Sequence, residues 1–214
     1  MRNVLKKCII FSFLLFFFIS ISAFSYVNAV FNDISDSVFI LHIIASSDSV
    51  EDQALKYKVR NKIIEYMNSI SNENNTKSKT IKLVNDNLEK FKQIAKQVIE
   101  ENGYDYSVNV SMGNFAFPTK KYGDISLPAG FYDALKIEIG DANGQNWWCV
   151  MFPPLCFVDV TNGIVPDESK ELIHKELSDE EYELISNETP EMKFKFKLLE
   201  LFTSVTDTFM AKKL

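Results

Sequence analysis

The sequence predicts an α+β fold, in which a helical hairpin and C-terminal helices pack on an antiparallel or mixed β-sheet. Three patterns in the 214-residue chain lead to this prediction. Apolar residues recur every three or four positions from residue 49 to 102, alternate every second position from 104 to 152, and return to helical spacing in the last third. With 46% hydrophobic and 24% charged residues, the composition is that of an ordinary globular protein.

Residues 1–29 predict an export signal. Met1–Lys7 carries three basic residues and no acid, and Cys8–Phe24 is apolar apart from three serines. Val27-Asn28-Ala29 suits cleavage after Ala29. The alternative is an uncleaved membrane anchor, because the apolar run is near the roughly 17 residues needed to span a bilayer. We expect residues 30–165 to form the α+β domain and residues 166–214 to be its acidic, helical C-terminal extension.

A central strand and a helical hairpin are predicted next. Val38–Ala45 is apolar on both alternating faces, as in a strand buried in the middle of a sheet. Ser49 and Asp52 form a variant capping box that begins a helix. The apolar stripe of that helix is Leu55, Val59, Ile63, Tyr66 and Ile70. After a polar linker, Ser71–Ser78, a second helix has the stripe Ile81, Val84, Leu88, Phe91, Ile94 and Val98, and Asn102-Gly103 ends it.

The middle of the chain predicts strands. Tyr106–Met112 alternates as a half-exposed strand, and Phe115–Thr119 extends or follows it, with Pro118 placing that part at an edge or a turn. Phe131–Ile139 also alternates. Gly140–Gly144 predicts a hairpin loop, so Asn146–Phe152 is expected to return beside the preceding strand.

The last third predicts helices. One runs over Pro166–Leu177, and Ser178 with Glu181 caps a second, short helix. A final amphipathic helix has the stripe Phe194, Leu198, Leu201, Phe202, Val205 and Phe209. Residues 167–191 hold ten acids and two lysines, so we expect no nucleic-acid partner.

The sequence offers no convincing catalytic, metal or cofactor site. His42 lies in an apolar strand, where we expect a hydrogen-bonded core residue, and we expect His174 to be solvated on a surface helix. No metal-ligand cluster, P-loop, dinucleotide fingerprint or G-x-S-x-G motif occurs. Asp48 and Asp52 could share one face of a helix start, but capping that helix is their simpler role. We therefore expect no cofactor and no small-molecule substrate.

Cys149 and Cys156 leave two states open. An exported chain meets an oxidising compartment, so a disulfide between them is chemically allowed. Two separately buried thiols fit the sequence equally well.

The pair Trp147-Trp148 is the most informative feature. Neighbours on a strand point to opposite faces, so one face would carry Trp147, Cys149 and Met151 and the other Trp148, Val150 and Phe152. Either the C-terminal helix buries the aromatic residues, or they form an exposed docking surface. For the second case, the partner-binding candidates are Trp147, Trp148, Phe152, Asp48 and Asp52.

The run Asn146–Asp159, N-W-W-C-V-M-F-P-P-L-C-F-V-D, closely resembles the signature of the stage II sporulation protein R family. The resemblance covers about residues 38–160, and Ser46 departs from it, since the family pattern has Asn there. The supporting blocks are Leu41–Asp48, Asp52-Gln53, Leu55-Lys56, Phe117–Lys120, Tyr122-Gly123 and Pro128–Ala134. The acidic stretch beyond Val165 does not match.

The resemblance implies a signalling protein of endospore-forming bacteria, made in the forespore and exported into the space between forespore and mother cell. It further implies that the protein activates a membrane-embedded aspartic protease of the mother cell, which then removes the pro-sequence of a sigma factor. We expect it to act by allosteric binding and not as an enzyme. One alternative is an exported hydrolase of cell wall or peptides that uses Asp48, Asp52 and His42. Another is an anchored structural protein of the spore envelope.

Overall fold

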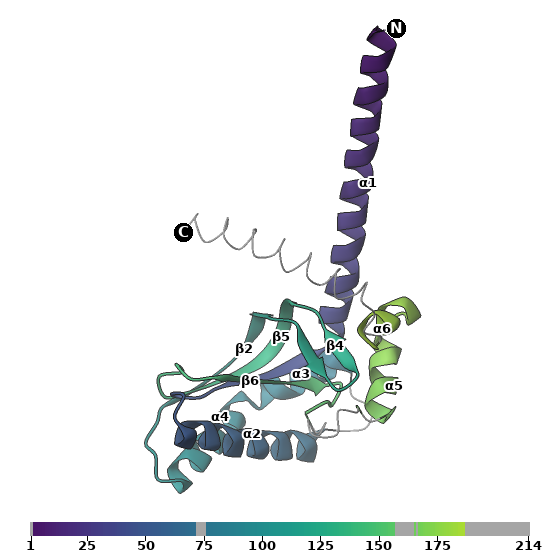
Figure 1. The fold of residues 1–214 in the computed structure, drawn as a ribbon. Helices are drawn as coiled ribbons and strands as arrows, with labels where there is room; N and C mark the ends of the chain where they lie inside the picture. Colours follow the sequence, from purple (N-terminus) through teal and green to yellow (C-terminus); the bar gives the residue numbers. More distant parts are fainter. Residues whose placement is uncertain (1, 72–75, 157–164, 166, 187–214) are drawn as a thin grey trace.

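The computed structural model describes residues 2–71, 76–156, 165 and 167–186. A mixed sheet of four strands lies at its centre, in the order β2-β5-β1-β6, and confirms the predicted α+β class (Figure 1). The strands are β1 (Phe39–Ile44), β2 (Val108–Phe117), β5 (Gly130–Ile139) and β6 (Asn146–Phe152). A small hairpin of β3 (Lys120–Tyr122) and β4 (Ile125–Leu127) lies beside the sheet.

One face of the sheet is covered by α2 (Val50–Ile70), α3 (Lys77–Asp86) and α4 (Leu88–Glu101). The predicted N-terminal cap of the first is confirmed, because the Ser49 side chain accepts a hydrogen bond from the Asp52 N–H. The Tyr66 hydroxyl donates to Asn87 Oδ1 (2.8 Å), whereas Lys58 bonds Asn102 at the opposite end of α4. These two contacts confirm the antiparallel hairpin.

The second predicted helix is divided in two, contrary to expectation. Asn87 separates α3 from α4 with φ −117° and ψ 13°, outside the helical range. Its side chain donates to the Leu83 carbonyl (2.8 Å) while it accepts from Tyr66, and this local bonding competes with helix continuation. The polar linker is also shorter than predicted, since Thr76 caps α3 and Lys77 begins it.

The sheet centre is confirmed, but the predicted hairpin is wrong. β1 is buried between β5, to which it is parallel, and β6, to which it is antiparallel. Strands β5 and β6 are therefore separated by β1. The connecting loop instead crosses the end of β1, where Asn143 and Gly144 donate backbone hydrogen bonds to the carbonyls of Ser46 (3.1 Å) and Ala45 (3.0 Å). Strand β2 runs through Phe117 and ends before Pro118.

The other face of the sheet is covered by the β3–β4 hairpin, the end of α1, α5 (Asp167–Glu176) and α6 (Asp179–Ser186). The predicted Ser178 cap is confirmed: Ser178 N–H donates to Glu181 Oε2 (2.8 Å), and Glu181 N–H donates to Ser178 Oγ (3.3 Å). The predicted helix with the stripe Phe194–Phe209 lies outside the described residues.

Helix α1 (Arg2–Ser37) contains an apolar stretch long enough to cross a membrane, consistent with a signal peptide or an anchor. It stays helical past Ala29, after which we expected cleavage. Its large apolar side chains are exposed as far as Tyr26, whereas Ile34 is completely buried. In Figure 1 the helix projects from the sheet on the side opposite α2 and α4. The fold therefore includes the inner end of α1.

Candidate docking surface

The loop before β6 is fixed through both backbone polar groups of Gln145. Its N–H donates to Asp48 Oδ1 (2.7 Å), and its carbonyl accepts from Lys56 Nζ (3.0 Å). Lys56 is only 1% exposed, and Gln53 Oε1 accepts a second bond from it (2.5 Å). Burial lowers the Lys56 pKa, although the nearby Asp48 carboxylate opposes that effect. The side chains of Asp48 and Lys56 thereby set where β6 begins.

Gly144 permits this loop to approach β1 closely. A Cβ at position 144 would lie 2.2 Å from the backbone oxygen of Ser47, which is far inside contact distance. Only glycine fits there without moving the backbone. The loop and the end of β1 therefore form one tightly packed unit.

Asp48 and Asp52 have separate partners. Whereas Asp48 binds Gln145, Asp52 is 6% exposed and accepts a hydrogen bond from Ser47 Oγ (2.5 Å). The Asp48 side chain is exposed and the Asp52 side chain is buried, and both carboxylates order this end of the sheet through these hydrogen bonds. Their assignment to partner contact stays a prediction. Among the described residues, no group of three or more His, Cys, Asp or Glu side chains could hold a metal ion.

His42 lies on the other face of the sheet from α2, next to Trp148 and Phe117. Its Nε2 pairs with Asn146 Oδ1 (2.7 Å), as expected for a hydrogen-bonded core histidine. Burial lowers the His42 pKa, and the Asn146 contact only partly offsets it. The hydrolase alternative requires His42 and Asp52 to lie together. The structure instead places them on opposite faces of the sheet. His174 is on α5, where it pairs with Asp179 (2.7 Å) at the surface.

Trp147 packs against α2 and forms an aromatic and cationic cluster with two of its residues. Its ring lies 5.3 Å from that of Tyr57, edge to face, and the Arg60 guanidinium is 4.5 Å from its centroid. Arg60 is also 5.0 Å from the Tyr57 ring. Burial against these rings lowers the Arg60 pKa. Tyr57 is 39% exposed, so this group, hereafter the Trp147 cluster (Tyr57, Arg60 and Trp147), reaches the surface.

Trp148 points to the opposite face, as alternation predicts. Its ring contacts Phe117 (6.1 Å between centroids), and the Lys120 ammonium lies 5.8 Å from it. Trp148 is therefore half-buried beneath the end of β2 and the start of β3. Among the described residues, the indole nitrogens of Trp147 and Trp148 are buried without a hydrogen-bond partner.

Phe152 does not lie where we predicted. The β1–β6 register shifts between Phe39 and Ile40, which pair with Phe152 and Val150, so Met151 is an extra residue. This bulge turns Phe152 to the helix-covered face with Cys149 and Met151, and it is 4% exposed. The expectation that Trp148 and Phe152 share one face is wrong, and a partner would not reach Phe152 in this fold.

Cys149 and Cys156 are joined by a disulfide, with 5.0 Å between their Cα atoms. This is the bridged one of the two states that the sequence left open. The bond links the middle of β6 to the residues that follow Pro153 and Pro154.

Sequence reasoning missed Tyr57, Arg60, Lys56 and Gln145. Tyr57 and Arg60 lie outside the apolar stripe of α2, where a polar face is the ordinary expectation. Their spacing of three placed them on one side of the helix, but nothing in the sequence placed Trp147 against that side.

Comparison with known proteins identifies one family. Residues 35–162 match the family described as Stage II sporulation protein R (spore_II_R). The chain is 37% identical over 145 residues to Stage II sporulation protein R of Bacillus subtilis (strain 168), which covers 67% of this chain and 65% of that relative. The match therefore spans slightly less than two thirds of the relative's length. No solved structure matches the chain.

Proposed function

The chain belongs to the stage II sporulation protein R family and has a role in sporulation, and from that premise we propose that it activates a protease by binding. The proposed partner is a membrane-embedded aspartic protease of the mother cell, which then removes the pro-sequence of a sigma factor. The protein acts from the space between forespore and mother cell. It contributes a binding surface, and the partner contributes the catalytic carboxylates.

The Trp147 cluster is the observation that supports binding most strongly. Trp, Tyr and Arg are the residue types that dominate the energetics of protein interfaces. Here all three meet at one surface position, and the bonds of Gln145 hold the start of β6 in place. A rigid cluster loses little conformational entropy on binding. Preferential binding to the active state of the protease by about 1–3 kcal/mol would shift its activity 5- to 150-fold.

The N-terminal helix and the disulfide support an extracytoplasmic location. Basic residues precede the apolar run, and this charge distribution favours a cytoplasmic N-terminus with the domain on the far side of the membrane. Cys149 and Cys156 are bonded, and disulfides persist in oxidising compartments. Both features agree with a domain that has crossed a membrane.

Deletion and complementation test the proposal. In an endospore-forming host, deletion of the gene should cause the sigma-factor precursor to accumulate, as seen by immunoblot. The wild-type gene should restore processing, whereas Arg60→Ala with Trp147→Ala should not, although the variant reaches normal levels outside the cytoplasm. Phe131→Ala is the matched control, because Phe131 is an exposed aromatic residue (61%) outside the cluster. Normal processing without the gene would contradict the proposal.

A further inference from the structure

Helix α1 enters the sheet without a flexible linker. It ends at Ser37, strand β1 begins at Phe39, and the one residue between them, Val38, is 1% exposed. Strand β1 is paired on both sides, so it is held firmly by its neighbours. Any rotation of α1 about this point would have to distort the central strand.

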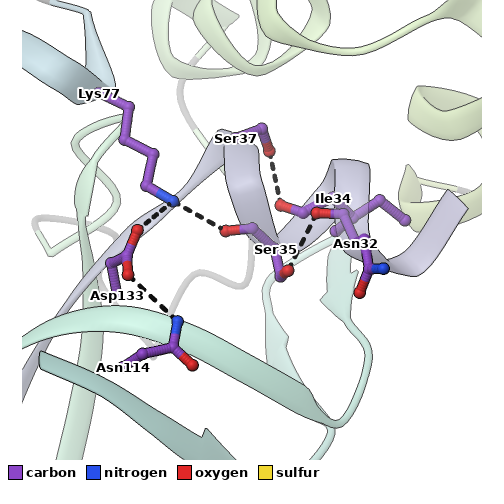
Figure 2. A network of polar contacts seen from close by, with 7 residues as sticks. All are labelled: Asn32, Ile34, Ser35, Ser37, Lys77, Asn114 and Asp133. Atoms are coloured by element: carbon purple, nitrogen blue, oxygen red, sulfur yellow. Dashed lines mark hydrogen bonds and ion pairs between the residues drawn. The ribbon is translucent and has the colours of Figure 1, made fainter. Parts of the chain in front are cut away.

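A polar network fixes the same end of the helix (Figure 2). Lys77 of α3 donates to the Ser35 carbonyl (3.2 Å) and forms an ion pair with Asp133 of β5 (2.8 Å). Asn114 of β2 donates to the second oxygen of that carboxylate (3.1 Å). Ser37 Oγ donates to the Ile34 carbonyl (2.7 Å).

This network stabilises the C-terminal end of α1 electrostatically. The last carbonyls of a helix lack intrahelical partners and carry partial negative charge, which a cation stabilises. The last turn of α1 contains no basic residue of its own. Lys77, only 9% exposed, supplies that cation from another element and ties it to the sheet through Asp133.

Apolar packing adds a third restraint. Ile34 is fully buried in the core that also contains Ile173 of α5 and Ile185 of α6, and Val30 packs against that core. Further out, the Tyr26 hydroxyl donates to Glu180 of α6 (3.2 Å). Contacts from α3, β5 and α6 thus surround the inner end of α1.

The outer part of α1 is suited to a bilayer. Its large apolar side chains, from Val4 to Phe24, are between 47% and 68% exposed, and water is an unfavourable environment for so much apolar surface. Ten residue steps separate Phe24 from Ile34, so Ile34 lies about 15 Å along the helix axis from the last exposed phenylalanine of the apolar stretch.

We propose that residues 30–37 form a rigid joint that holds the domain at a fixed height and orientation above the membrane in which the uncleaved α1 sits. Because α1 leaves the sheet on the side opposite α2 and α4, those helices face away from that membrane (Figure 1). The contacts that support the rigid joint do not depend on the proposed function. Only the consequence of the joint for presenting the Trp147 cluster rests on the proposed function.

Energy transfer in nanodiscs tests this joint directly. The full chain, with Cys8→Ser, receives a donor dye at either Asp36→Cys or Lys90→Cys, which are exposed positions on α1 and α4. The nanodisc headgroups carry the acceptor. We expect high transfer from position 36, low transfer from position 90, and a narrow lifetime distribution at both. Equal transfer from the two positions would overturn the proposal.

Two variants test the joint without disrupting the fold of the domain. Lys77→Met with Asp133→Leu replaces the ion pair by apolar residues, which is often tolerated. It should broaden the distribution at position 90, and an unchanged distribution would contradict the role of Lys77. A Gly-Ser-Gly-Ser insertion between Ala29 and Val30 leaves the joint intact but interrupts the helix above it, so it should broaden both distributions. No broadening with this insertion would overturn the proposal, as would an extracytoplasmic form that begins at Val30.

Discussion

Lys56 donates a hydrogen bond from its buried ammonium to the backbone carbonyl of Gln145, 89 positions further along the chain (3.0 Å). Because the N–H of the same residue is bonded to Asp48, helix α2 and the end of β1 together fix the start of β6. The position of Trp147, two residues later, depends on this arrangement.

Loss of the Lys56 contact should destabilise the protein measurably. Lys56→Met keeps most of the side-chain volume but leaves the Gln145 carbonyl without its donor, and such a loss costs about 1–3 kcal/mol. We expect this decrease in the free energy of unfolding in urea titrations of the full chain in detergent. Lys62→Ala is the control on the same helix, because Lys62 forms an exposed ion pair with Glu65. Such a pair contributes at most about 1 kcal/mol. Equal stability of the two variants would contradict the structural role of Lys56.

Phe152 should act through stability and not through a surface. Phe152→Ala removes a buried ring and should cost about 3–5 kcal/mol of unfolding free energy. Phe131→Ala, at an exposed position near the start of β5, should stay within about 0.5 kcal/mol of wild type. Thermal unfolding followed by circular dichroism distinguishes the two. A stable Phe152→Ala protein would show that the bulge at Met151 is placed incorrectly.

Asp133 should make stability depend on pH in the acidic range. Burial alone would raise the Asp133 pKa, but the hydrogen bonds from Lys77 and Asn114 outweigh burial and hold it below its ordinary value. A carboxylate with a lowered folded-state pKa contributes its full stability above the unfolded pKa, near 3.9, and loses it as the pH falls towards the folded pKa. Wild type should therefore lose stability more steeply below about pH 4 than Asp133→Asn. Parallel stability curves for the two proteins would contradict this assignment.

The elements that local pattern determines were predictable. Val38–Ala45 is apolar on both faces, and only a central strand buries both. The helix caps at Ser49 and Ser178 were predictable because they are also local. Each depends on a hydrogen bond between a side chain and an amide three residues apart.

The strand neighbours were not predictable from pattern. Gly140–Gly144 has the length and composition of a hairpin loop, and alternation identifies a strand without naming its partner. What decides the order is the bonding of the Asn143 and Gly144 amides to the end of β1, which is a contact about 100 positions distant in sequence. The prediction of the face on which Phe152 lies failed for a related reason. The bulge that turns this side chain arises from the pairing of β6 with β1, which the sequence of one strand does not show.

The candidate site was half predictable. Alternation placed Trp147 and Trp148 on opposite faces, as the structure has them. Tyr57 and Arg60 became visible only once α2 was seen to lie against β6. The assignment of Asp48 and Asp52 to partner contact stays a prediction, and their internal hydrogen bonds to Gln145 and Ser47 could not be foreseen from the sequence.

The affinity between the purified full chain and the membrane-embedded protease, each in nanodiscs, tests the central claim most directly. Interface residues of this kind contribute 2 kcal/mol or more, so Trp147→Ala should weaken binding by about 30-fold or more while far-UV circular dichroism stays unchanged. Phe131→Ala should bind as wild type does. A folded Trp147→Ala protein that binds the protease as tightly as wild type would contradict the account.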